Sequence, residues 1–125
     1  HGVSGGERQL ALIARALATE AGYLVMDEPT ANLDYGNQSR VLEEVARLRE
    51  SGIGVLVSTH HPEHAFRIAD RVLLLAAGRL AAQGPTLATL TPAALSSLYG
   101  RPIEVAAITL ADGASHRVCV PASPP

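Results

Sequence analysis

Two short apolar runs that end in polar side chains constrain the fold more than any other feature of the chain. Residues 23–26 lead into Asp27 and Glu28, and residues 54–59 lead into His60. Apolar runs of this length without polar alternation are typical of strands buried on both faces of a parallel sheet. Ligands of such sheets bind at the carboxyl ends of the strands, so these polar side chains are candidates for a functional site.

Helical patterns alternate with these two runs. The spacing of Ser4 and Glu7 is that of a capping box, which predicts a helix that begins there and stops by Gly22. Pro62 suits the first position of a short helix through about Ala69. The apolar positions expected in the first helix are Leu10, Ile13, Ala14, Leu17 and Ala18, and those of a second helix, closing near Ser51-Gly52, are Val41, Leu42, Val45 and Leu48. The order helix, strand, helix, strand, helix predicts an α/β fold with a parallel sheet and right-handed crossovers.

The second half of the chain has a different pattern. Two predicted hairpins turn at Ala77-Gly78 and at Asp112-Gly113. Between them, Thr91-Pro92 is expected to begin a short helix that ends at Tyr99-Gly100. The expected strands are residues 71–76, 79–83, 103–110 and 116–120, and residues 121–125 are expected to form a loose tail.

Composition excludes several classes of protein. The chain has 125 residues, enough for one domain at most, and its 47% hydrophobic and 18% charged residues are a globular balance. A formal net charge of −2 provides no overall basic field, so we expect no nucleic-acid partner. The single cysteine, Cys119, excludes an internal disulfide framework and a cysteine-rich zinc site. No apolar run approaches the roughly 20 residues of a membrane-spanning helix.

Asp27 and Glu28 form an acidic pair at the predicted end of a strand. Neighbouring side chains there point in different directions, so one carboxylate can hold a cation while the other addresses a second atom. This arrangement suits nucleotide hydrolysis, in which Asp27 holds Mg²⁺ and Glu28 positions or deprotonates the attacking water. The structural alternative is a solvated acidic pair at the start of a loop.

His60 is a further candidate, because its ring could hydrogen-bond a terminal phosphate or the water. One alternative is a surface histidine before a helix. Another is a metal site made with His61 and His64, which the sequence disfavours because Pro62 should start a helix that leaves His60 outside it.

The segment Ser4-Gly5-Gly6 is a candidate anion site, because a helix N-terminus exposes N–H groups. Two glycines in a first helical turn cost stability, and they make sense where a phosphate must approach the backbone closely. The alternative is an ordinary capped helix.

Four segments occur in a fixed order along the first half of the chain. They are VSGGE at residues 3–7, LVMDEP at residues 24–29, ANLD at residues 31–34, and the pair His60-His61. Together they resemble the second half of the nucleotide-binding domain of ABC-type ATPases. The first is similar to the signature usually written LSGGQ, the second to Walker B with its catalytic Glu, and the third to the D-loop. His60 matches the switch histidine, and His61 stands where the family often has Asp.

The resemblance implies an ATPase of the P-loop, RecA-like α/β class with ATP and Mg²⁺ as cofactors. It implies that Asp27 organises Mg²⁺, that Glu28 acts on the water, and that His60 holds the γ-phosphate. Two such domains would close head to tail on two ATP molecules. The residues that would contact the partner's nucleotide are Ser4, Gly5, Gly6 and Glu7. The D-loop residues at the dimer interface would be Asn32, Leu33 and Asp34, with Asp34 linking the two sites.

Two further stretches narrow the resemblance. Residues 34–38 (DYGNQ) and residues 98–121 are similar to ATPases of iron–siderophore, haem and cobalamin importers, with molybdate importers as a related alternative. That family implies permease subunits, a substrate-binding protein, and a place on the cytoplasmic face of the membrane. The rival interpretations are a non-transport ABC ATPase of the translation-factor or DNA-repair kind, and a truncated, non-catalytic interaction module.

The basic residues of the chain are all arginine. A P-loop needs a glycine-rich turn and a lysine that reaches the β and γ phosphates, so these 125 residues contain none. The family's Q-loop, which precedes the signature, is also missing. We therefore expect residues 1–125 to be a partial nucleotide-binding domain, from the signature to the C-terminus, that is inactive by itself. Its sheet would lack the P-loop strand and leave apolar surface uncovered.

Overall fold

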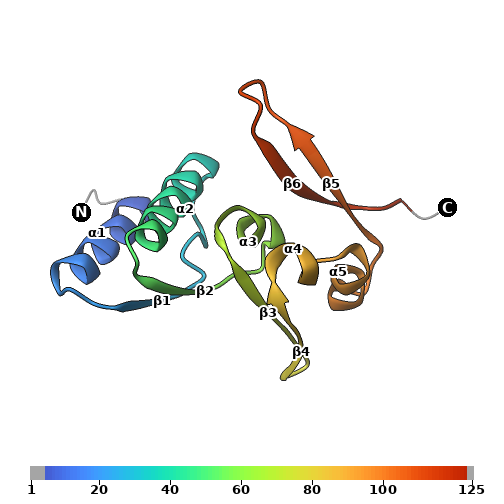
Figure 1. Cartoon of the computed structure of the whole chain (residues 1–125), viewed down its shortest axis with the longest axis horizontal. Helices are drawn as coiled ribbons and strands as arrows, with labels where there is room; N and C mark the ends of the chain where they lie inside the picture. Colours follow the sequence, from blue (N-terminus) through green and yellow to red (C-terminus); the bar gives the residue numbers. More distant parts are fainter. Residues whose placement is uncertain (1–4, 124–125) are drawn as a thin grey trace. The chain divides into compact units, whose positions relative to one another are not determined.

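The computed structural model describes residues 5–123, which divide after His60 into two compact units. The first unit contains α1 (Gly5–Ala18), β1 (Tyr23–Asp27), α2 (Tyr35–Glu50) and β2 (Gly54–Ser58). Both helices of this unit lie on one side of the β1–β2 pair (Figure 1). The predicted alternation of helices and strands is therefore confirmed.

Strands β1 and β2 pair in parallel, as predicted. Tyr23 stands opposite Gly54 at one end of the pair, and Asp27 stands opposite Ser58 at the other. The carboxyl ends of both strands thus lie at the same edge, which is where the predicted acidic pair and His60 follow. This register decides which side chains can meet at the site.

The covered face of the pair packs against the helices. Met26 of β1 is buried, as are all four apolar residues predicted for α2, namely Val41, Leu42, Val45 and Leu48. On α1 the expected apolar face is only partly covered. Ile13 is buried and Leu10 is half-buried, but Ala14, Leu17 and Ala18 are exposed. The buried stripe of α1 runs instead through Gly6 and Ile13, two helical turns apart, because that side meets α2.

The other face of the pair is open to solvent. Its apolar side chains are Tyr23, Val25 and Leu56, which are 82%, 72% and 58% exposed. We call these three residues the open face. The ring of Tyr23 lies over Gly54, so that a Cβ built on that glycine would lie 2.5 Å from Tyr23 Cδ1. The expectation of uncovered apolar surface is confirmed.

The second unit is built on two hairpins and three short helices. Its elements are α3 (Pro62–Ile68), β3 (Arg71–Ala76), β4 (Arg79–Pro85), α4 (Thr86–Thr89), α5 (Pro92–Tyr99), β5 (Ile103–Thr109) and β6 (Ser115–Pro121). Both strand pairs, β3–β4 and β5–β6, are antiparallel. The first turn has positive φ at Ala77 and Gly78, the conformation that tight hairpins favour. Leu74, Leu90 and Leu95 form the buried core of the unit.

Three details of this unit differ from the sequence expectations. Strand β4 continues to Pro85, and the short helix α4 was not expected. This helix is anchored through Thr86, whose N–H donates to Asp70 O at 3.1 Å and whose hydroxyl donates to Ala69 O at 2.7 Å. A single turn of helix is too short to show a periodic pattern. The tail is also less loose than expected, because Pro121 ends β6 and the N–H of Ala122 donates to Pro102 O at 2.9 Å.

Within residues 5–123, no helix combines the length and apolar character that crossing a membrane requires.

Candidate functional site

The carboxyl edge of the β1–β2 pair gathers three of the predicted site residues. Asp27 is the last residue of β1, and Glu28 follows it directly. His60 comes two residues after β2 ends, and its Nε2 is paired with Glu28 Oε1. The His60 side chain is 82% exposed, so the ring is open to solvent while it holds the carboxylate. Sequence reasoning therefore placed Asp27, Glu28 and His60 correctly at one edge.

Ser58 completes this edge, and sequence reasoning missed it. Its hydroxyl donates a hydrogen bond to Asp27 Oδ1. The hydroxyl oxygen of Ser58 in turn accepts the backbone N–H of Glu28 at 3.0 Å, and that N–H also lies 3.0 Å from the backbone oxygen of Ser58. One side chain from β2 thus holds the carboxylate of Asp27 and the backbone of Glu28. The available signal was register, because a parallel pairing of the two apolar runs places a polar residue of the second beside Asp27.

Glu28 has an unusual backbone conformation, with φ of +45°. Non-glycine residues in this left-handed region are uncommon and mark functional or constrained positions. The loop that follows is tightly held: Pro29 is fully buried, and the N–H of Ala31 donates to Glu28 O at 3.0 Å. Asn32 also has positive φ, at +62°. The conformation of the whole loop between the acidic pair and α2 is therefore closely specified.

The predicted D-loop ends at the start of α2. Asp34 is the N-cap residue, and its Oδ1 accepts the N–H of Asn37 at 2.8 Å. The side-chain amide of Asn37 donates back to Asp34 Oδ2 at 3.0 Å. Gln38 adds a third link, because its Nε2 donates to Leu33 O at 2.9 Å. Asn37 and Gln38 thereby fix the two D-loop residues that precede the helix.

The predicted signature segment lies against this same D-loop. Gly6 is buried, and a Cβ built on it would lie 2.6 Å from Asn37 Oδ1 and 2.9 Å from Asn37 Cβ. A Cβ on Gly5 would lie 2.8 Å from Leu33 Cδ2. The sequence interpretation attributed both glycines to the approach of a phosphate. The structure supplies another reason, since the direction of each missing Cβ is toward the chain's own D-loop and α2.

Two other signature residues have simpler outcomes. Glu7 is exposed in the first turn of α1, where its negative charge is favourable beside the helix N-terminus. Ser4, the expected N-cap, lies outside the described residues.

The donor set at the carboxyl edge fits a magnesium ion shared with a phosphate ligand. Mg²⁺ is bound through one or two carboxylates plus waters and substrate phosphates, rather than by an all-protein cage. Asp27 offers such a carboxylate with a hydroxyl beside it. No group of three or more His, Cys, Asp or Glu side chains within residues 5–123 could hold a metal ion. The alternative of a histidine metal site is therefore not supported, although the rings of His61 and His64 lie 4.6 Å apart.

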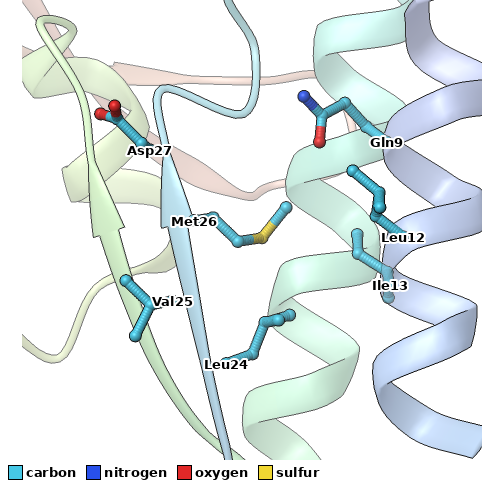
Figure 2. Close-up of a pocket in the computed structure, with 7 residues that line it drawn as sticks. All are labelled: Gln9, Leu12, Ile13, Leu24, Val25, Met26 and Asp27. Atoms are coloured by element: carbon cyan, nitrogen blue, oxygen red, sulfur yellow. The ribbon is translucent and has the colours of Figure 1, made fainter.

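A cavity of about 310 Å³ lies between α1 and β1. Figure 2 shows Leu12 and Ile13 of α1 facing Met26 of β1, with Asp27 at the end of the strand and Val25 on its opposite side. The lining is mainly apolar, with Gln9 and Asp27 as its polar members, and it suits packing side chains better than a polar ligand. The cavity therefore reflects incomplete packing around α1, which also leaves Ala14 and Leu17 exposed.

Comparison with known proteins shows the family. Residues 1–64 match the family model described as "AAA domain, putative AbiEii toxin, Type IV TA system". The hemin import ATP-binding protein HmuV of Rhodococcus jostii is 41% identical over 103 residues, which are 82% of this chain and 35% of that protein. An uncharacterized ABC transporter ATP-binding protein of Haemophilus influenzae is 52% identical over 75 residues, 60% of this chain and 28% of that protein. The chain belongs to the family that this AAA-domain model describes and to the ABC transporter ATP-binding proteins. The ABC ATPase chain thus spans about a third of the length of these relatives.

Solved structures agree with this assignment. The ABC ATPase chain matches an inward-facing "putative metal-chelate type ABC transporter" with a TM-score of 0.86 and 36% identity, over 96% of this chain and 48% of that one. It also matches a dimeric ATP-binding cassette bound to ADP and Pi, with a TM-score of 0.56 and 31% identity, over 66% of this chain and 36% of that one. The predicted α/β fold, a portion of the ABC ATPase fold, is confirmed. Related cassettes therefore bind nucleotide and dimerise.

Proposed function

We propose that this chain is part of the ATP-hydrolysing subunit of an ABC importer for haem or a comparable iron chelate. The observation that carries the proposal is the meeting of Asp27, Glu28 and His60 at the carboxyl edge of a parallel strand pair. The similarity to a hemin import protein and to a metal-chelate type transporter supports the cargo. Residues 1–125 would be one part of a nucleotide-binding domain, and the phosphate-binding loop would come from sequence outside them.

In this proposal the two acids divide the chemistry. Asp27 would hold Mg²⁺, which when bound neutralises charge on the phosphates of ATP. Glu28 would orient the attacking water and take its proton. Ser58 contacts the two acids differently, because its hydroxyl donates to the Asp27 carboxylate while its oxygen accepts the backbone N–H of Glu28.

His60 would bind the γ-phosphate through its imidazole. Its pairing with Glu28 Oε1 supports this role, because it keeps the ring beside the carboxylate that would address the water. The same contact gives Glu28 a partner that fixes its position without burying it. Water and phosphate could then approach from the exposed side of the ring.

The signature segment would act on the ATP held by a second subunit. Its residues are Ser4, Gly5, Gly6 and Glu7. The last three form the first turn of α1, a 14-residue helix whose N-terminal end attracts anions. Asn32, Leu33 and Asp34 would lie at the interface between the two subunits. The similarity to a cassette that is dimeric and bound to ADP and Pi supports this arrangement, although this chain covers only 36% of that one.

The other partners in the proposal follow from the transporter family. They are membrane permease subunits and, through them, a substrate-binding protein, with the ATPase on the cytoplasmic face of the membrane. Molybdenum import is a second candidate, because the import ATP-binding protein ModC of Aromatoleum aromaticum is 50% identical over 84 residues, 66% of this chain and 22% of that protein.

The test uses the product of the complete open reading frame that contains this chain. We expect Mg²⁺-dependent phosphate release from ATP by that product, and none by the 125 residues alone, which lack a lysine for the β and γ phosphates. With the cognate permease in vesicles, a haem-loaded binding protein should stimulate hydrolysis and a molybdate-loaded one should not. Equal turnover by the 125 residues alone, or stimulation by molybdate instead of haem, would overturn the corresponding part of the proposal.

A further inference from the structure

Asn37 touches both segments that the proposed function assigns to a partner's nucleotide. Its backbone N–H and its side-chain amide donate to the two carboxylate oxygens of Asp34, at 2.8 Å and 3.0 Å. Its Cβ, Cγ and Oδ1 fill the space in which Gly6 lacks a side chain. Asn37 is the third residue of α2, and it is half-buried.

We propose that Asn37 is a positioning residue that locks the signature end of α1 to Asp34 of the D-loop. The assignment of these two segments to the nucleotide rests on the proposed function, whereas the lock itself is a property of this chain. Only a glycine fits at residue 6 beside Asn37 in its present position. Because Asn37 in that position bonds to Asp34, the orientation of Asp34 depends on the absence of a side chain at residue 6. The two segments then move as one body.

The chemistry of Asn is suited to this role. Its amide nitrogen is a donor and reaches the acidic Asp34, while its amide oxygen lies toward Gly6. A carboxylate in the same place would have no donor for Asp34 and would repel its charge. A residue that only completed the cap of α2 would need no more than its backbone N–H, and it would have no relation to Gly6.

The local contacts also explain why Asn37 cannot simply move aside. A clash with the far end of a flexible side chain is cheap, but a Cβ on Gly6 would also meet the Cβ of Asn37 at 2.9 Å, close to the helix backbone. Turning the side chain away would break the amide bond to Asp34 Oδ2. Gly5 differs, because a Cβ there would meet only the mobile end of Leu33.

The experiment compares matched glycine variants in the product of the complete open reading frame. Gly6→Ala creates the clash, and Gly36→Ala is its control, because a Cβ on the exposed Gly36 would lie 3.5 Å from Asp34 Oδ1, an ordinary contact. Asn37→Gly keeps the backbone N–H but removes the side chain, so the double variant Gly6→Ala/Asn37→Gly has no clash. Asn37→Asp keeps the shape and removes the donor.

The first readout is hydrogen exchange of the residue 37 amide in nucleotide-free protein, measured by NMR. This amide donates to Asp34 Oδ1, so its protection reports whether Asp34 keeps the orientation that the lock is proposed to hold. Gly6→Ala should lower the protection about tenfold, as expected for loss of a charge-assisted hydrogen bond. Gly36→Ala should leave it unchanged, and the double variant should match Asn37→Gly alone. This readout does not depend on any ATPase activity.

The second readout is steady-state hydrolysis. Asn37→Asp should lower kcat with little change in KM for ATP, because the lock acts on the partner's site at closure rather than on ATP binding to one subunit. Protection unchanged in Gly6→Ala, or a double variant less protected than Asn37→Gly alone, would overturn the lock. A lock confirmed by exchange in a protein with no ATPase activity would overturn the proposed function and leave the lock standing.

Discussion

Ser58 stands opposite Asp27 in the register of β1 and β2, and its hydroxyl donates a hydrogen bond to the Asp27 carboxylate. A neighbouring strand, not the acidic segment itself, thus sets the direction of that carboxylate. The same serine oxygen receives the N–H of Glu28, whose backbone is left-handed. The geometry of the two acids therefore depends on a residue 30 positions further along the chain than Glu28.

Ser58→Ala should leave Asp27 and Glu28 less firmly positioned without removing either carboxylate. We expect a loss of about 1 kcal/mol in the free energy of unfolding, the usual net value of a hydrogen bond. Hydrolysis by the complete protein should also need more Mg²⁺, because Asp27 is no longer oriented. Urea denaturation and a Mg²⁺ titration of the hydrolysis rate measure the two effects. Ser58→Thr keeps the hydroxyl and is the control, and an unchanged Mg²⁺ requirement in Ser58→Ala would contradict the role of the serine.

Glu28→Gln should nearly abolish hydrolysis in the complete protein and preserve ATP binding. The amide keeps the shape of the side chain and loses the base, a change that costs about 10²–10⁴-fold in rate. ATP that is not hydrolysed should then hold the closed dimer together. Phosphate release and analytical ultracentrifugation with ATP are the measurements. Asp27→Asn is the contrasting variant, since it should weaken the Mg²⁺ site, and near-normal turnover of Glu28→Gln would assign the base elsewhere.

Gly5→Asp should act on the nucleotide of the partner subunit. A carboxylate at the N-terminus of α1 would oppose the γ-phosphate and block closure, while ATP still binds to each open monomer. Gly5→Ala is the necessary control, because any Cβ there meets Leu33 Cδ2 of the chain's own D-loop.

Mixed dimers of the complete subunit decide whether this effect is in trans. One chain carries Gly5→Asp, and the other carries a substitution of its P-loop lysine. If the signature acts in trans, both defects fall on one site and the other site occludes ATP normally. If no site remains competent, the signature acts within its own subunit.

Stability should depend on pH through His64 at the start of α3. Burial lowers the pKa of His64 from 6.5, and the charges of His61 and Arg67 lower it further, against a rise from Glu63. The unfolded chain then takes up the proton more readily than the folded one, so the free energy of unfolding falls as the pH drops below 6.5. Above 6.5 this contribution is complete.

His64→Gln should flatten that pH dependence. Urea denaturation at pH 5.5 and pH 7.5 compares the variant with the original chain, and His116→Gln on the β5–β6 hairpin is the control. The same loss of stability on acidification in His64→Gln as in the original chain would place the responsible group elsewhere.

Hydrophobic periodicity, together with the polar and turn residues that separate the apolar runs, was sufficient to predict most elements of the fold. The apolar positions of α2 and the turns at Gly78 and Gly113 are local signals, and the structure confirms them. Helix α4 gave no such signal, because one turn shows no period and its anchor is the backbone of Ala69 and Asp70. On α1 the sequence indicated a helix correctly, but which side of it is covered depends on its packing against α2.

The candidate site divides in the same way. The carboxyl edge with Asp27, Glu28 and His60 follows from where strands end, so the sequence was enough to place it. Ser58 and Asn37 act through strand register and through the cap of α2, which are spatial relations that spacing alone does not reveal. The sequence singled out Gly6 and explained it by the approach of a phosphate. That explanation was incomplete, because only the structure shows that Asn37 occupies the space of the missing side chain.

Because Tyr23 is part of the open face, its ring can report spectroscopically on whether that face is covered. The chain has three tyrosines and no tryptophan. Substituting Phe for Tyr35 and Tyr99 would leave one phenol ring, lying on β1 among the exposed apolar side chains. Near-ultraviolet absorbance of that ring would then record the moment at which any other segment or subunit covers this sheet, without a dye or a label.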